Sequence, residues 1–123
     1  GLTMMTQEVA KFMKAQERGT IINIGSTAST NGFASGSVYC ASKFAVRGLT
    51  ACWRNELRKN NIRVILVNPS EVPTAFNNKD RKERDEEDKK LRSKDIAHAI
   101  ISAIQMDERG FIPELNVWAT NPF

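Results

Sequence analysis

Hydrophobic and polar positions along this chain follow two patterns, one typical of amphipathic helices and the other of buried strands. Apolar residues recur at steps of three and four in residues 2–17, in residues 38–59 and again from Ser93 onward, which predicts three helices. Residues 20–25 and 62–67 are apolar runs of the kind found in strands covered on both faces. Residues 111–118 form a third predicted strand, so the predicted order is helix, strand, helix, strand, helix, strand.

Each predicted helix carries an apolar stripe that we expect to be buried. No capping residue precedes Leu2, so we expect the first helix to begin upstream of it, and Gly19 is a plausible stop. Ser93 is predicted to cap the third helix, with Asp95 favourable in its first turn. The expected stripes are Met4, Met5, Val9, Phe12 and Met13 in the first helix, Phe44, Ala45, Leu49, Cys52, Trp53 and Leu57 in the second, and Ile96, Ile100, Ile101 and Ile104 in the third.

The alternation of helices and strands predicts an α/β fold with a parallel sheet and right-handed crossovers. A length of 123 residues is within the range of one domain, although three strands make a thin sheet. The first predicted strand is too apolar to be stable as an unpaired edge strand. We therefore expect another strand or chain to pair with it. No apolar run approaches the ~20 residues of a membrane span, and we expect no membrane association.

Composition narrows the expected partners and compartment. The formal net charge is only +4, and basic residues are dispersed among acids without interleaved aromatic residues. An ordinary solvated surface is therefore favoured over nucleic-acid binding. Cys40 and Cys52 lie on one predicted helix, about 18 Å apart at ~1.5 Å per residue, which is too far for a disulfide. Two free thiols favour a reducing, cytoplasmic compartment.

Residues 79–92 are the most charged stretch of the chain, with seven basic and six acidic residues and one apolar residue. Opposite charges four residues apart, as in Asp85 with Lys89 and Glu86 with Lys90, favour a solvated helix. We interpret the stretch as an exposed, mobile helix or loop that could fold over a substrate as a lid. A specific charge-recognition surface is the alternative.

Tyr39 and Lys43 are four residues apart on the second predicted helix and therefore share one face. A tyrosine has a pKa of about 10, and a neighbouring ammonium lowers that pKa by favouring the phenolate. Such a pair is suited to moving a proton on or off an alcohol oxygen. Ser26 follows the first predicted strand at its carboxyl end, where ligands bind in open α/β sheets, and could donate a hydrogen bond to the same oxygen. A Tyr four residues before a Lys is by itself a common surface pair, so the candidate site depends on this context.

Three motifs extend that context. The run from Ile21 reads Ile-Ile-Asn-Ile-Gly-Ser, residues 39–43 read Tyr-Cys-Ala-Ser-Lys, and residues 68–74 read Asn-Pro-Ser-Glu-Val-Pro-Thr. Together they resemble the short-chain dehydrogenase/reductase family, and most of all its 3-oxoacyl-carrier reductase branch. The family patterns are a Ser after a similar strand, Tyr-x-x-x-Lys and Asn-Pro-Gly-x-Val-x-Thr. The resemblance spans essentially the whole chain, as the carboxyl-terminal half of a family member.

This resemblance implies that residues 1–123 are the carboxyl-terminal portion of one Rossmann-type domain with a doubly wound parallel sheet. It implies NAD(P)-linked interconversion of a carbonyl and an alcohol on a small molecule, with NADP somewhat favoured. Tyr39 would be the acid/base, Lys43 would hold the nicotinamide ribose, and Ser26 would orient the substrate oxygen. The nicotinamide end of the cofactor would be contacted by Pro69, Val72 and Thr74.

Other residues carry weaker functional signals. Phe33, in the loop between Ser26 and Tyr39, is a candidate to line the substrate pocket. His98 has no partner at metal-ligand spacing, so we expect no metal site. We interpret Cys40 as a small packing residue.

Three departures separate the chain from the family pattern. The glycine-rich turn that admits the cofactor pyrophosphate does not occur in this sequence, so we expect the amino-terminal dinucleotide-binding half to be absent. The equivalent of the family's catalytic Asn would fall just before Gly1, and Asn23 cannot replace it from its strand. Ser70 stands where the family usually has Gly, which tolerates a positive φ more readily.

The sequence therefore predicts a fragment of an NAD(P)-dependent oxidoreductase that is inactive by itself. The alternative is a non-catalytic α/β oligomerisation or interaction module that kept the helices for assembly. In the family that the sequence resembles, the first long helix and the Tyr39 helix commonly pack against their copies in a partner subunit. A homo-oligomer is therefore expected, or association with the missing half.

Overall fold

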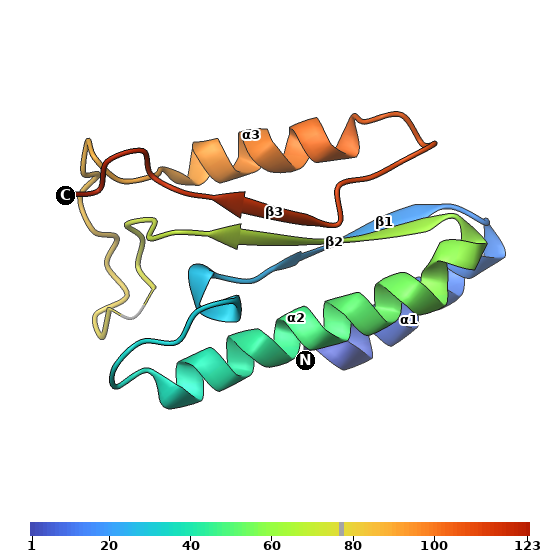
Figure 1. Ribbon diagram of the computed structural model, residues 1–123, viewed down its shortest axis with the longest axis horizontal. Coiled ribbons are helices and arrows are strands. Elements are labelled where there is room, and N and C mark those ends of the chain that lie inside the picture. The colour runs from blue at the N-terminus through green and yellow to red at the C-terminus, as the bar shows by residue number, and fades with distance from the viewer. Residues whose placement is uncertain (77) are drawn as a thin grey trace.

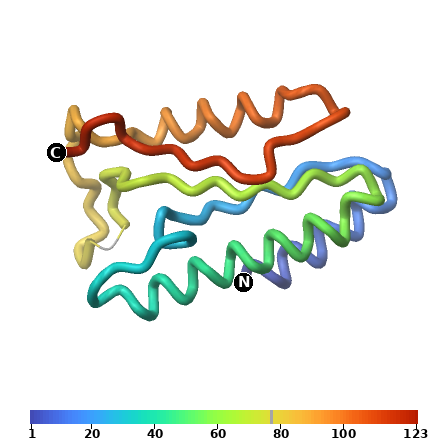
Figure 2. The backbone as a smooth tube through the Cα atoms, viewed as in Figure 1, coloured from blue at the N-terminus to red at the C-terminus, as the bar shows by residue number. Residues whose placement is uncertain are grey.

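The computed structural model describes residues 1–76 and 78–123, which form an α/β arrangement (Figure 1). Three parallel strands form a sheet in the order β1-β2-β3. The elements are α1 (Leu2–Ala15), β1 (Gly19–Ile24), η1 (Thr27–Ser29), α2 (Ser37–Leu57), η2 (Arg58–Asn60), β2 (Ile62–Pro69), α3 (Ser93–Ile104) and β3 (Glu114–Val117). The tube view shows α1 and α2 on one side of the sheet and α3 on the other (Figure 2). The predicted fold class and order of elements are confirmed.

The central strand β2 divides the hydrophobic core into two clusters, because successive side chains of a strand point to opposite faces. Ile62 and Val64 face α1 and α2, whereas Ile65 and Val67 face α3. All four side chains are at most 1% exposed, which confirms the predicted buried strand. The helical residues buried in these clusters are Ala10, Trp53 and Leu57 on one side and Ala103 on the other.

The register of the sheet brings the carboxyl ends of all three strands to one edge. Residues 19–24 of β1 pair with residues 62–67 of β2, and residues 66–69 of β2 pair with residues 114–117 of β3. In the part of the chain that the structure describes, β1 pairs with β2 alone, so its other edge is open. The segments that follow the strands, beginning at Gly25, Ser70 and Trp118, therefore emerge side by side.

Several apolar positions that helical periodicity assigned to the core are exposed. The buried residues of α1 are Thr6 and Ala10, and the buried residue of α3 is Ala103. Each apolar stripe is wider than the helix's contact with the sheet, so the flanks of the stripe remain uncovered. The prediction of burial is wrong for Met4, Met5, Phe12, Phe44, Ala45, Cys52, Ile101 and Ile104.

Residues 79–92, predicted as an exposed helix or loop, form turns and irregular backbone. Three predicted boundaries differ from the structure. Helix α1 ends at Ala15, and Gly19, its predicted stop, is instead the first residue of β1. The cap of α3 is Arg92, whose backbone N–H donates to the Asp95 carboxylate at 2.8 Å, so Ser93 is the first helical residue and not the cap. The last strand begins at Glu114 and not at residue 111, because Pro113 has no N–H for the ladder.

Candidate active site

Ser26 is held in a tight turn at the carboxyl end of β1. Its side-chain oxygen accepts a hydrogen bond from the backbone N–H of Ala28 at 3.2 Å, and its own backbone N–H donates to Ser29 Oγ at 3.1 Å. This reciprocal arrangement is a capping box that starts η1. Gly25 is buried just before it, where a Cβ would lie 2.3 Å from Asn68 Oδ1. The lack of a side chain at Gly25 therefore lets the turn pack directly on β2.

Tyr39 and Lys43 lie one turn apart in the first half of α2, and both are half-buried. Lys43 Nζ is 5.8 Å from the centre of the Tyr39 ring, so the two side chains share one face, as the spacing predicts. The helix packs against η1, the turn that begins after Ser26. The structure thus brings the Ser26 turn against the helix that carries the phenol and the ammonium.

Two phenylalanines flank the Tyr39 ring. The ring centroids of Phe33 and Phe76 lie 6.3 Å and 6.0 Å from that of Tyr39, each at a tilted angle. Phe33 approaches the start of α2 because Gly36 has no side chain; a Cβ there would lie 2.2 Å from the Phe33 ring. Phe76 was missed in the sequence because no local spacing links it to Tyr39. The one sequence signal that could have pointed to Phe76 is its position, as a large apolar residue two positions after Thr74.

The turn after β2 is tied to the carboxyl-terminal tail. The backbone N–H of Ser70 donates to the Val117 carbonyl at 2.9 Å, and Ser70 Oγ accepts from the backbone N–H of Ala119 at 3.1 Å. Ser70 does not adopt a positive φ. The serine at the family's usual glycine position therefore brings no left-handed strain and adds a hydrogen bond. It fastens the tail beside the turn that follows Pro69 and contains Val72 and Thr74.

Glu71 joins that turn to the charged segment of residues 79–92. Its Oε2 lies 2.9 Å from Lys90 Nζ, and its Oε1 lies 2.9 Å from Arg84 Nη1. The hydrogen bond from Lys90, followed by that from Arg84, holds the pKa of Glu71 below its ordinary value of 4.5. Arg84 Nε also donates to the Thr74 carbonyl at 3.3 Å. The segment is thus held to the turn at Arg84 and at Lys90.

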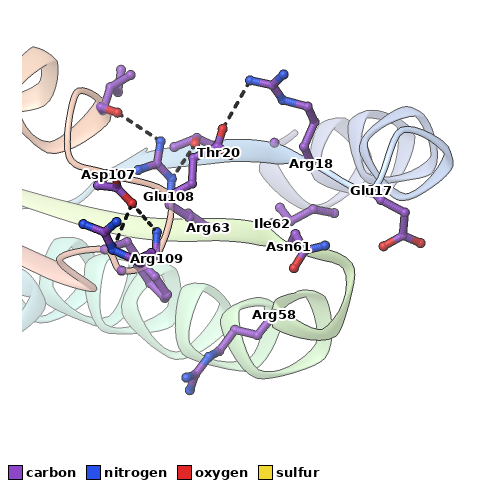
Figure 3. Close-up of a pocket in the computed structure, with 14 residues that line it drawn as sticks. Glu17, Arg18, Thr20, Arg58, Asn61, Ile62, Arg63, Asp107, Glu108 and Arg109 are labelled. Atoms are coloured by element: carbon purple, nitrogen blue, oxygen red, sulfur yellow. Dashed lines mark hydrogen bonds and ion pairs between the residues drawn. The ribbon is translucent and has the colours of Figure 1, made fainter.

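Two cavities lie at opposite ends of the strands. A cavity of about 870 Å³ lies at their amino ends, where Arg18 pairs with Glu108 at 3.3 Å and Arg63 donates to Thr20 Oγ1 at 3.0 Å (Figure 3). Arg109 pairs with Asp107 in the same cavity, which contains none of the predicted site residues. A cavity of about 300 Å³ lies at the carboxyl edge, lined by Thr27, Asn31, Ser70, Glu71, Lys90, Trp118, Ala119 and Pro122. We place the candidate site at this second edge, because the candidate reactive side chains lie beside it.

Among residues 1–76 and 78–123 the structure offers neither a metal-ion site nor a membrane-spanning helix. In these ranges no group of three or more His, Cys, Asp or Glu side chains could hold a metal ion. His98 is exposed on α3. No described helix combines the length and apolar character needed to cross a bilayer.

Comparison with known proteins identifies the family. A family model described as short chain dehydrogenase matches residues 1–85. The NADP-dependent 3-hydroxy acid dehydrogenase of Schizosaccharomyces pombe is 30% identical over 128 residues, which cover 98% of this chain and 49% of that protein. The 3-oxoacyl-acyl-carrier-protein reductase FabG of Thermotoga maritima is 37% identical over 79 residues, which cover 64% of this chain and 32% of that protein. The chain belongs to the short-chain dehydrogenase/reductase family.

Solved structures show the same relationship. The closed form of serine dehydrogenase complexed with NADP⁺ matches with a TM-score of 0.82 and 28% identity, over 94% of this chain and 50% of that chain. A FabG structure from Bacteroides thetaiotaomicron matches with a TM-score of 0.75 and 25% identity, over 94% of this chain and 46% of that chain. The fold is therefore part of a Rossmann-type sheet, as predicted. The chain spans about half the length of these relatives.

Proposed function

We propose that this chain supplies the substrate-side half of an NAD(P)-dependent oxidoreductase that interconverts a carbonyl and an alcohol. The observation that carries the proposal is the placement of Tyr39 and Lys43 on one face of α2, against the turn that begins at Ser26. The names of two relatives support it, since one is a 3-hydroxy acid dehydrogenase and the other a 3-oxoacyl reductase. The remainder of the sheet, including the pyrophosphate site, is proposed to lie outside this sequence.

The residues present fit the nicotinamide and ribose end of the cofactor. Lys43 offers an ammonium that can donate to ribose hydroxyls, from the same helix face as the Tyr39 phenol. Val72 and Thr74 lie in the turn at the carboxyl edge of the sheet, where dinucleotides bind in such folds. NAD(P)H supplies the hydride when bound. A preference for NADP is proposed from the printed names of relatives alone.

Each polar side chain has one task in the proposed proton transfer. Tyr39 gives its phenolic proton to the carbonyl oxygen during reduction and accepts it back during oxidation. The ammonium of Lys43 stabilises the phenolate that forms on Tyr39 when the proton is transferred. Ser26 Oγ accepts a hydrogen bond from Ala28, so its own hydrogen remains available to donate to the substrate oxygen. Substrate orientation and proton transfer are thereby assigned to different elements.

The aromatic side chains exclude water from that oxygen. Phe33 and Phe76 border the Tyr39 ring on two sides, although both are more than half exposed in this chain. We assign Phe33 to the substrate pocket, together with the cavity of about 300 Å³ at the same edge of the sheet. Residues 79–92, fastened to Glu71, are proposed to close over the substrate as a lid.

The uncovered faces of α1 and α2 support assembly with another chain. Met4, Met5 and Phe12 are between 66% and 76% exposed, which is unusual for neighbouring large apolar side chains. A Cβ at Gly48 would meet nothing within 4 Å, so α2 has room there for a partner. We propose a homo-oligomer that buries these faces. The same faces are what a purely structural module would keep, and this is the alternative function.

Replacement of Tyr39 by phenylalanine separates the two functions. In the full-length protein that contains this chain, Tyr39→Phe keeps the ring contacts but removes the transferable proton, so kcat should fall by about 10²–10⁴-fold. Cofactor binding, followed by fluorescence, should change little. Ser42→Ala is a matched control, because the exposed Ser42 hydroxyl donates to the Tyr39 carbonyl of its own helix. A Tyr39→Phe rate within a few-fold of wild type would refute the catalytic assignment.

A further inference from the structure

A polar network connects α2 to the two strands that border the candidate site. Glu114, the first residue of β3, accepts hydrogen bonds from Arg47 Nε at 3.1 Å and 3.3 Å and from Arg47 Nη2 at 3.3 Å. The same carboxylate accepts a hydrogen bond from Asn68 Nδ2 on β2 at 2.8 Å. The Glu114 side chain is 22% exposed and that of Arg47 is 47% exposed. One carboxylate thus holds a helix and a neighbouring strand at once.

The network begins on the catalytic face of α2. Arg47 follows Lys43 by four residues and Tyr39 by eight, so the three side chains lie along one face of the helix at successive turns. A bidentate guanidinium–carboxylate contact fixes direction as well as distance, because both groups are planar. The Arg47–Glu114 contact therefore restricts both the rotation of α2 about its axis and its sliding along the sheet.

The other end of the network reaches the Ser26 turn. Asn68 is 0% exposed, and its Nδ2 is shared between Glu114 and Asn116 Oδ1, the latter at 3.1 Å. Its Oδ1 is buried without a hydrogen-bond partner in the described residues and packs where a side chain at Gly25 would stand. Gly25 immediately precedes Ser26. A continuous series of contacts thus runs from the Tyr39 helix to the Ser26 turn through Glu114 and Asn68.

We propose that Glu114 is a positioning residue that sets the distance between the Tyr39–Lys43 face and the Ser26 hydroxyl, a role that rests on the function proposed above. Glu114 does not touch the reacting atoms. It balances the Arg47 charge on the face that already carries Lys43, and it fixes the amide of Asn68 against Gly25. Loss of the carboxylate would loosen α2 relative to the Ser26 turn, while the Asn23–Thr50 hydrogen bond and Arg54 keep the helix on the sheet. Displacement of a reacting group by about 1 Å can cost about 10²-fold in rate.

The test uses steady-state kinetics of the full-length protein that contains this chain. Glu114→Ala should lower kcat about 10–100-fold while the KM for cofactor stays within about two-fold, because Lys43 stays on α2. Arg47→Ala should lower kcat similarly, and the double variant should lose no more than the larger single loss, because both act through one contact. Arg47→Lys should recover part of the rate, since it keeps the charge but not the bidentate geometry. Glu108→Ala, which breaks the exposed ion pair with Arg18 at the other end of the strands, is the control and should leave kcat unchanged.

Two results would overturn the proposal. One is a kcat within two-fold of wild type for Glu114→Ala in a protein that folds. The other is single-variant losses that multiply in the double variant. If Glu114→Ala does not fold, Glu114→Gln is measured in its place. The glutamine keeps an acceptor for Asn68 but loses the ion pair with Arg47. An unchanged kcat in this variant would also overturn the proposal. Failure of the proposed function is recognised separately, because Tyr39→Phe would then retain activity.

Discussion

Gly25→Ala tests how the Ser26 turn is seated on β2. The added Cβ would lie 2.3 Å from Asn68 Oδ1, 2.6 Å from Ser29 Oγ and 3.2 Å from Leu66 Cδ1. The first two distances are far inside the ~3.5–4.0 Å of ordinary non-bonded contact. Asn68 and Ser29 are both 0% exposed, and both are engaged in hydrogen bonds. The glycine's own backbone must therefore move, and Ser26 moves with it.

The expected cost follows from overpacking of a filled core. Forcing a methyl group into such a site destabilises a protein by about 1–3 kcal/mol. For a complete protein of roughly 150–250 residues this corresponds to a fall in melting temperature of roughly 2–12 °C. Because the displacement is directed at Ser26, kcat should fall as well, by up to about 10²-fold for a shift near 1 Å. Calorimetry and steady-state kinetics on the same preparation measure both quantities.

Gly32→Ala is the matched control within the same connection. A Cβ at Gly32 meets nothing within 4 Å, and the residue has no positive φ. The substitution should be neutral or stabilise the protein by about 0.4–1 kcal/mol, because alanine lowers the conformational entropy of the unfolded chain. If Gly25→Ala matches wild type in melting temperature and kcat, the packing of Asn68 against the turn does not constrain Ser26 and the reasoning fails. Equal losses at both glycines would contradict it too.

The remaining predictions concern the cofactor, the charged segment and assembly. The isolated 123-residue chain should bind NADH and NADPH weakly, because it has no glycine-rich turn for the pyrophosphate; micromolar binding by calorimetry would contradict this. Amide exchange in residues 79–92 should be fast compared with β2 at neutral pH, and faster in Glu71→Gln. Because the pKa of Glu71 is lowered below 4.5, its ion pairs with Lys90 and Arg84 persist at pH 4.5 and above, and should be lost as the pH falls through that lowered pKa. Amide exchange rates in residues 79–92, corrected for the intrinsic effect of pH on exchange, should rise when the pairs are lost. Phe12→Lys should shift sedimentation towards smaller species, and an unchanged distribution would exclude α1 from the interface.

The order of elements was predictable because its signals are local. Apolar runs and helical periodicity act within a few residues, and the strands at residues 20–25 and 62–67 were found to within one or two residues. Tyr39 and Lys43 were found on one face because helix geometry alone relates them. The functional roles assigned to these residues and to Ser26 remain predictions.

What the sequence could not predict depends on contacts between distant segments. Periodicity located the apolar stripe of α1 but not the extent of its cover, so Met5 and Phe12 were misplaced. Ion pairs within residues 79–92 favoured a helix, but such pairs are worth only ~0.2–0.5 kcal/mol each. Arg84 and Lys90 also pair with Glu71, outside the segment, which spacing along the chain does not reveal. Phe76 and Glu114 join the site region through tertiary contacts alone.

Because β2 divides the core, substitutions on its two faces act on different helices. A change at Ile65 or Val67 alters the surface on which α3 packs, whereas a change at Ile62 or Val64 alters the surface on which α1 and α2 pack. Mutational effects at sites more than ~7–10 Å apart that share no partners usually add. A lineage can therefore remodel the α3 side without disturbing the helix that carries Tyr39. Selection on α3 and its surroundings and selection on the proton-transfer apparatus can then proceed at different rates within one short chain.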